Sequence, residues 1–288
     1  MAPSIRSRKA SPSPPGAEPA RFTCAFSKDQ RLTVEKRLPL PAANPPHAPR
    51  RAVISDARRD PRGALIDQID GRGADQPQDN PETAAQRFVA MRAYQELRRE
   101  ARDDGDPRTV AVQQANKAIR DKAAADFLAR ARLGASTASS FRERWALFWA
   151  NHFTVSGAKE LTAVMVGPFE QEVIRPYAFG RFEDMLVAST THPAMLTYLD
   201  QAQSVGPGSL AGARNGRRGL NENLAREILE LHTIGIEAGY SQADVTEFAR
   251  ALTGFSVGRE DEDRAGQFVF RENIHEPGAR TLLGKAYR

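Results

Sequence analysis

The chain has 288 residues, 40% of them hydrophobic and 27% charged, which is typical of a globular protein of one or two domains and argues against disorder throughout. The single cysteine, Cys24, excludes both a disulfide within the chain and a cysteine-based zinc site. The formal net charge of +5 is uneven: residues 1–60 hold 12 basic and 5 acidic side chains and the rest hold 29 and 31, so we expect no nucleic-acid partner.

The N-terminal segment lacks the pattern of a folded domain. It contains ten of the 19 prolines and shows no sustained hydrophobic periodicity, so residues 1–59 are predicted to form a disordered tail rich in proline and arginine. A helical domain is predicted over residues 60–288. Residues 1–20 have no apolar core of a signal peptide, and no segment reaches the roughly 20 apolar residues of a membrane-spanning helix. The sequence therefore shows no export signal and no membrane span, and it leaves the localisation open.

Three helices are expected in the first half of this domain. Residues 64–69 predict a short helix with Pro61 in its opening turn. Hydrophobic residues at three- and four-residue steps predict longer helices over residues 81–103 and 110–133, which should be antiparallel because a glycine and a proline separate them. The periodic residues of the second long helix are Val112, Ala115, Ile119, Ala123 and Phe127.

Residues 141–152 predict a helix with a wide aromatic face. At about 100° per residue, five large side chains fall on one side of it, and we expect that side to be buried. They are Phe141, Trp145, Phe148, Trp149 and His152. Further helices are predicted over residues 161–173 and 182–188, and from Pro193 through Asp200.

The last third combines a long loop with two more helices. Five glycines between residues 203 and 219 indicate the loop. A helix is predicted over residues 220–233, with Leu220, Leu224, Ile228 and Leu231 on its inward stripe. Ser241 and Asp244 have the spacing of a capping box at the start of a helix over residues 241–252. Because only residues 268–270 have the character of a strand, we predict an all-α domain with at most a small β-hairpin near the C-terminus.

Several short blocks, in order, carry a family resemblance over residues 141–287. They are Trp149-Ala150-Asn151-His152-Phe153-Thr154-Val155-Ser156, His192-Pro193-Ala194-Met195-Leu196 with Tyr198-Leu199-Asp200, Ser204 with Gly206-Pro207, Asn221-Glu222-Asn223-Leu224-Ala225-Arg226-Glu227, Leu229-Glu230-Leu231-His232-Thr233 and Ala251-Leu252-Thr253-Gly254-Phe255. In these blocks the chain resembles the bacterial domain-of-unknown-function 1800 (DUF1800) family.

The resemblance implies a partner but no reaction. Members of the family are uncharacterised, often exported, and often encoded beside a second uncharacterised family with a sulfatase-like fold. Members also continue with further helices beyond the point that corresponds to Tyr287, so we expect the domain to be incomplete at its C-terminus.

Glu227 is the first candidate for chemistry. It lies at the edge of the apolar stripe of its helix, with Glu230 on the adjacent flank, and a buried carboxylate is costly unless something pairs with it. The structural explanation is an ion pair with Arg226, Arg175 or Arg250, or the capping of a neighbouring helix. The functional one is an acid–base or metal-binding role.

Four of the five histidines lie in the family-like half of the chain: His152, His192, His232 and His275. His152 sits on the aromatic face at a helix C-terminus, where the helix dipole favours its protonated form and burial opposes it. No H-E-x-x-H or E-x-x-H spacing occurs, so His152, Glu227 and His232 are metal-ligand candidates without a motif, and ordinary core histidines are the alternative.

The glycine-rich loop supplies the third candidate site. Arg214, Arg217 and Arg218 precede a helix N-terminus, where backbone N–H groups favour an anion. The loop matches neither a P-loop nor a dinucleotide fingerprint, so a plain surface loop is the alternative.

Two functions remain open at this stage. The preferred one is a noncatalytic helical scaffold or accessory protein that acts with a sulfatase-like partner. The alternative is a metal- or anion-dependent hydrolase with catalytic candidates Glu227, Glu230 and His152. The sequence identifies no cofactor for either.

Overall fold

The computed structural model describes residues 54–55, 57–71, 76–77, 81–101, 107–214 and 219–287. The predicted tail over residues 1–59, with Cys24, lies almost entirely outside the described residues and stays a prediction. The first long-range packing is that of α2 (Pro61–Asp70) on α5 (Ser140–His152). Asp60 caps α2, because its Oδ1 accepts a hydrogen bond of 2.9 Å from the backbone N–H of Gly63.

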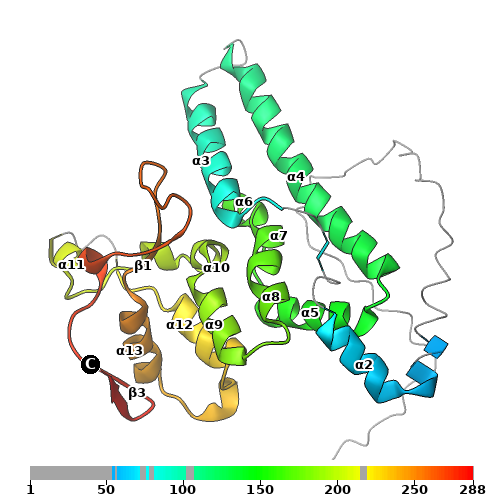
Figure 1. Cartoon of the computed structure of the whole chain (residues 1–288). Helices are drawn as coiled ribbons and strands as arrows, with labels where there is room; N and C mark the ends of the chain where they lie inside the picture. Colours follow the sequence, from blue (N-terminus) through cyan, green and yellow to red (C-terminus); the bar gives the residue numbers. More distant parts are fainter. Residues whose placement is uncertain are drawn as a thin grey trace, which may run out of the picture. The chain divides into compact units, whose positions relative to one another are not determined.

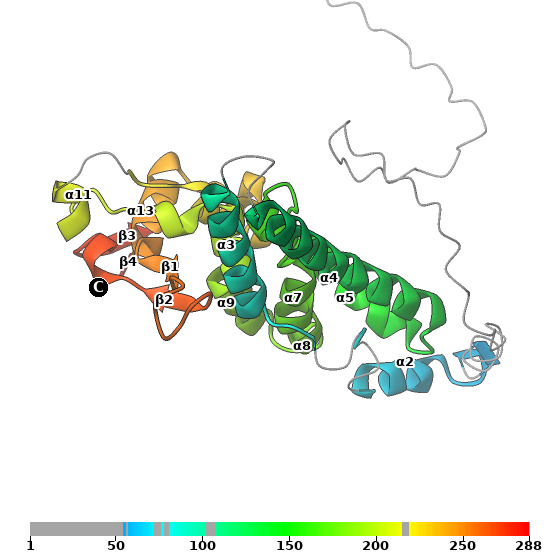
Figure 2. The same ribbon diagram turned by 90° about the horizontal axis from the view of Figure 1, so that it is seen from above.

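Helices α3 (Ala84–Glu100) and α4 (Arg108–Ser136) form the expected antiparallel pair and lie side by side in both views (Figures 1 and 2). The inward side of α3 carries the buried residues Phe88, Met91 and Tyr94. The expected register of α4 is wrong at Phe127, which is 71% exposed. At that level Asp126 points inward instead and pairs with Arg87 of α3 at 3.1 Å. Phe127 is turned about 100° away from it and faces solvent.

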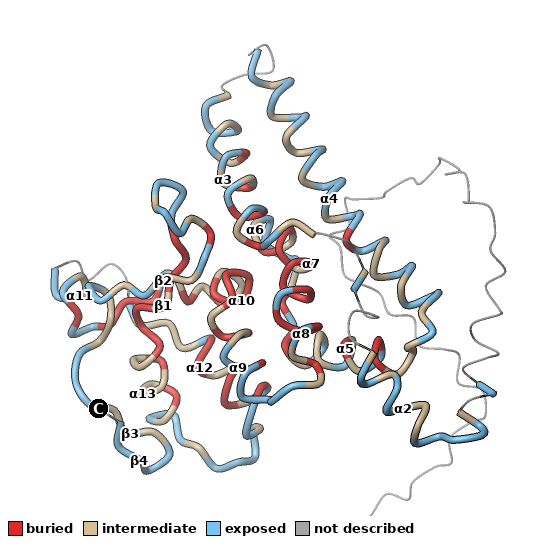
Figure 3. Tube along the Cα trace, viewed as in Figure 1, coloured by how far each residue is buried: buried red, intermediate tan, exposed pale blue. Residues whose placement is uncertain are grey.

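The middle of the chain is a series of short helices. Turns and π-helical segments interrupt the helix predicted over residues 161–173. The elements are α6 (Glu160–Ala163), α7 (Val166–Phe169), the π-helix η1 (Glu170–Ile174), α8 (Arg175–Tyr177), α9 (Phe182–Thr191), α10 (Pro193–Tyr198), η2 (Gln201–Gln203) and α11 (Leu210–Arg214). Figure 3 shows buried residues gathered from α7 through η1 to the start of α8 and along α10, whereas α2 and much of α4 are exposed. The core of the domain therefore lies among these short helices.

A second π-helix changes the inward face of the predicted helix over residues 220–233. It is made of α12 (Asn223–Glu227) followed by η3 (Ile228–His232). Leu224 and Ile228 are buried as expected, but Leu231 is 55% exposed, and Leu229 and His232 take the inward positions. The wider π turn holds more residues than an α turn, so it moves the apolar stripe out of the 3.6-residue register.

The C-terminal part confirms the fold class. The short η4 (Ile236–Ala238) leads to α13 (Gln242–Leu252), which begins with the predicted capping box: Asp244 N–H donates to Ser241 Oγ at 3.2 Å and Ser241 N–H to Asp244 Oδ2 at 2.8 Å. Strand β1 (Phe255–Val257) pairs antiparallel with β2 (Phe268–Phe270), and after η5 (Glu272–Ile274) β3 (Arg280–Leu282) pairs with β4 (Lys285–Tyr287). The domain is thus helical with two small hairpins. No helix among the described residues has the length and apolarity that crossing a membrane requires.

Candidate functional site

Glu227 is half-buried at the end of α12, and its expected ion pair is absent. It makes no hydrogen bond or ion pair with another described residue. The proposed partners are engaged elsewhere: Arg226 with Glu222 and Glu230, Arg250 with Glu247, and Arg175 with Glu143 and Glu170. Burial, followed by the neighbouring charge of Glu230, raises the pKa of Glu227 above its usual value.

The substitution Glu227→Gln is expected to stabilise the fold at neutral pH. A carboxyl whose folded-state pKa is raised above its unfolded value contributes stability at low pH, and this contribution is lost as the pH rises through the folded pKa. Gln keeps the shape and removes the charge. Urea unfolding of both proteins should give the variant the larger free energy of unfolding at pH 7. This difference should vanish near pH 4. A variant less stable than the parent at pH 7 would mean that the ionised carboxylate has a favourable partner.

His152 and His232 meet each other but not the carboxylates. His152 Nε2 donates to the backbone carbonyl of His232 at 3.0 Å, and the two rings lie 6.1 Å apart. His232 is buried, and burial together with the charge of His152 lowers the pKa of His232 to about 4. Neither ring hydrogen bonds to Glu227 or Glu230, and within the described part of the chain no three His, Cys, Asp or Glu side chains are grouped to hold a metal. Metal binding by His152, Glu227 and His232 therefore stays a prediction.

The glycine-rich loop already holds a carboxylate of the protein itself. The backbone N–H of Gly208 donates to Glu276 Oε2 at 2.6 Å, and that of Gly206 donates to the Ile274 carbonyl at 2.9 Å. Arg214 ends α11 on the exposed side of the loop, while Arg217 and Arg218 lie outside the described residues. This part of the loop docks against the segment after η5, and an anion at the three arginines stays a prediction.

The aromatic face of α5 is half-buried at the edge of the core, and Phe148 is its one exposed side chain. Trp145 and Phe148 stack with ring centroids 5.1 Å apart, and Phe148 is 51% exposed. The buried side of α5 instead carries Arg142, Glu143 and Ala146. Trp145 is held in place because its Nε1 donates to the Ala178 carbonyl at 2.7 Å. The prediction of a buried aromatic face is therefore wrong at Phe148, whereas the other four side chains of the face are half-buried.

An apolar groove of about 460 Å³ continues this aromatic face toward α2. We call the groove and the adjoining Phe148 the α5 surface. The groove is lined by Ile54, Ala57, Leu65, Gln68, Ser140, Phe141, Arg144 and Trp145.

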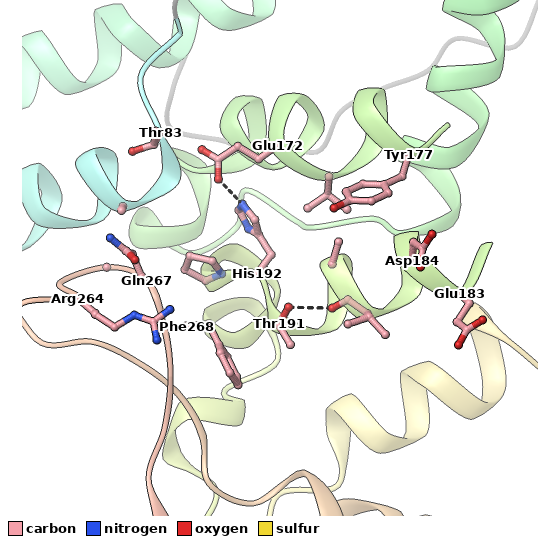
Figure 4. A pocket seen from close by; sticks show the side chains of 16 residues that line it. Thr83, Glu172, Tyr177, Glu183, Asp184, Thr191, His192, Arg264, Gln267 and Phe268 are labelled. Atoms are coloured by element: carbon pink, nitrogen blue, oxygen red, sulfur yellow. Dashed lines mark hydrogen bonds and ion pairs between the residues drawn. The ribbon is translucent and has the colours of Figure 1, made fainter. Parts of the chain in front are cut away.

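A larger cleft, of about 760 Å³, lies on another part of the domain and was not predicted. It is bounded by α9, the η1–α8 segment, the start of α10, the start of α3 and the loop before β2 (Figure 4). Its polar lining residues are Thr83, Glu172, Tyr177, Glu183, Asp184, Thr191, His192, Arg264 and Gln267. We call this space the central cleft.

A hydrogen-bonded pair, Glu172 and His192, lies at the middle of the central cleft (Figure 4). His192 Nδ1 accepts from the backbone N–H of Ala194 at 3.1 Å, so the ring proton is on Nε2, which donates to Glu172 Oε2 at 3.0 Å. Glu172 Oε1 accepts from the backbone N–H of Ala84 at 2.7 Å. The pair thus caps α10 and α3, and both imidazole nitrogens are occupied. In this state His192 has no lone pair free to act as a general base.

The comparisons with known proteins give one family. Residues 47–288 match the sequence model of a family described as "Protein of unknown function (DUF1800)". The chain belongs to the DUF1800 family. None of the curated proteins and none of the solved structures compared matches it.

Residues of the blocks by which the sequence resembles DUF1800 proteins form hydrogen bonds that stabilise this fold. Asn221 Nδ2 donates to the carbonyls of Leu199 and Asp200 at 3.1 and 3.2 Å, and Asn221 N–H donates to Ser204 Oγ at 3.0 Å. The hydroxyl of Thr253 accepts from the backbone N–H of Glu276 at 2.8 Å. These bonds satisfy partly buried backbone groups between short elements, which have few regular backbone bonds of their own. The signature residues of this DUF1800 chain therefore hold the irregular core together.

Proposed function

We propose that this DUF1800 domain is a noncatalytic helical accessory protein that binds a second protein through the α5 surface. The observation that carries the proposal is the exposed Phe148, which stacks on the half-buried Trp145 beside an apolar groove. Aromatic side chains held rigidly at a surface lose little conformational entropy on binding and are enriched at the centres of protein interfaces. Trp145 is fixed by its bond to Ala178, and Phe148 is stacked upon it.

The proposed partner is a protein of sulfatase-like fold, because members of the DUF1800 family are often encoded beside a family with such a fold. The groove would take an apolar side chain of that partner. Arg144 at the groove has no carboxylate partner among the described residues, so an acidic residue of the partner would complete the contact at the rim.

The test is co-purification and titration of the two proteins with matched variants. Phe148→Ser should weaken binding about tenfold or more, which corresponds to about 1.4 kcal/mol, a common loss for a central aromatic residue. Phe127→Ser is the control, since Phe127 is a still more exposed phenylalanine on α4 and is not part of the α5 surface. Equal affinities for both variants, or no complex at all, would contradict the proposal.

The alternative is a metal- or anion-dependent hydrolase that uses Glu227, Glu230 and the histidines His152 and His232. The raised pKa and the missing ion pair of Glu227 favour it, because functional carboxyls are commonly held in such environments. Metal analysis of the purified protein separates the two proposals. Stoichiometric metal that is lost in Glu227→Gln with the fold retained would support the hydrolase and not the accessory protein.

A further inference from the structure

We infer that the central cleft binds a zwitterionic ligand of the size of a short peptide. Its ammonium group meets Glu183 and Asp184 at one end of the cleft, and its carboxylate meets Arg264 at the other. The ligand is independent of the partner proposed for the α5 surface.

The charges of the cleft are separated by sign. Figure 4 shows Glu183 and Asp184 together at one end and Arg264 and Gln267 at the opposite end, with Glu172 and His192 between them. The side chains of Asp184 and Arg264 form no ion pair or hydrogen bond with another described residue, although many surface charges of the domain are paired. Glu183 pairs only with the exposed Arg181 on the same turn. The charged side chains at both ends of the cleft can therefore pair with a ligand that carries opposite charges at its two ends.

The wall that carries Arg264 is held rigidly. Gly266 has φ +69°, and a Cβ there would lie 2.8 Å from the backbone of Ala85, so the loop docks directly on the start of α3. Within the same loop Glu262 is bound by Arg271 through two bonds of 3.0 and 2.9 Å. These bonds, with that of the Arg259 backbone, lower the pKa of Glu262 to about 2. Arg264 therefore projects from a fixed loop, which reduces the entropy that binding must overcome.

The middle of the cleft suits the body of a peptide. Glu172 is fixed by His192 and by the N–H of Ala84, yet its side chain remains 36% exposed, so its oxygens can accept from ligand amide N–H groups. Tyr177, Val187 and Phe268 supply apolar surface beside it. A volume of about 760 Å³ exceeds what one amino acid fills and lies within the usual range of ligand sites.

Calorimetric titration of the full chain with alanine peptides, from di-alanine to penta-alanine, tests the inference. At low ionic strength, where exposed ion pairs are least screened, at least one peptide with free ends should bind. N-acetylation or C-amidation of that peptide should each weaken binding about tenfold. Absence of binding across the series, or equal affinity for free and blocked peptides, would overturn the inference.

Two variants that each remove one charge test which end of the cleft binds the ammonium group and which binds the carboxylate. Asp184→Asn should weaken binding of the free peptide about tenfold and leave the affinity of the N-acetylated peptide unchanged. Arg264→Gln should weaken binding of the free peptide about tenfold and leave the affinity of the C-amidated peptide unchanged. Both side chains are exposed, so the circular dichroism spectrum and the melting temperature should be retained. Asp263→Asn, an exposed neighbour of Arg264 outside the cleft, is the control and should bind like the parent. Variants that weaken free and blocked peptides equally would contradict the assigned orientation.

Discussion

Replacement of Arg175 by methionine is expected to destabilise the domain by about 3–5 kcal/mol, because it leaves the buried carboxylate of Glu143 without its cation and leaves Glu170 with Arg130 alone. The Arg175 side chain is 0% exposed, and its two terminal nitrogens bind the two oxygens of Glu143 at 2.6 and 3.0 Å. Its Nε also donates to Glu170 at 3.0 Å. The arginine thereby joins α5 to the η1–α8 segment in the core. Urea unfolding at pH 7 measures the loss.

The control is the exposed ion pair between Arg98 and Glu160, whose atoms lie 3.1 Å apart. Arg98→Met removes the same charge at the surface and should cost no more than about 1 kcal/mol, since exposed pairs gain little over their hydration. If the two variants lost equal stability, the buried cluster would not be the polar centre of this core.

Acidification from pH 6.5 to pH 5 is expected to destabilise the fold through His232. Its folded pKa of about 4 lies below the unfolded value of 6.5, so the unfolded state binds the proton first. The contribution of neutral His232 to the free energy of unfolding is fully present above pH 6.5 and is lost as the pH falls toward 4. The slope is about 1.4 kcal/mol per pH unit within that window. Unfolding free energies measured at intervals between pH 5 and 7.5 give the slope directly.

A His232→Leu variant separates this effect from that of the carboxylates. The pKa values of Glu222, Glu230 and Glu262 are lowered in the fold, and the stability that they contribute is lost only below their unfolded values near 4.5. The variant should therefore show a much flatter profile between pH 5 and 6.5. An unchanged slope would assign the proton uptake to another group.

Local signals in the sequence were sufficient for most helices. The Ser241–Asp244 capping box and the antiparallel α3–α4 pair depend on residues close in the chain, and the structure confirms both. The inward faces were harder to predict. Leu231 is exposed because the π turn of η3 changes the spacing, and Phe127 is exposed because Asp126 takes the inward position to pair with Arg87. Neither the π turn nor the Asp126–Arg87 pair has a signal in the local pattern.

The functional surfaces depend on tertiary placement, which a single sequence does not show. Glu172 and His192 are 20 residues apart, and the wall opposite them comes from the loop around Arg264, so no short motif connects the parts of the central cleft. The aromatic side chains of α5 were found from the sequence, but the exposure of Phe148 was not. A wide apolar stripe is typical of a buried face, and here the core side of α5 holds Glu143 for Arg175 instead.

Hydroxyl-radical footprinting of this protein, alone and mixed with a protein of the proposed sulfatase-like family, tests the accessory-protein account most directly. Complex formation should protect Trp145, Phe148 and Leu65 from oxidation, because these side chains would be covered by the partner. Phe127 on α4 should react equally in both samples. A complex in which Phe148 keeps its reactivity, or two proteins that do not associate, would contradict the account.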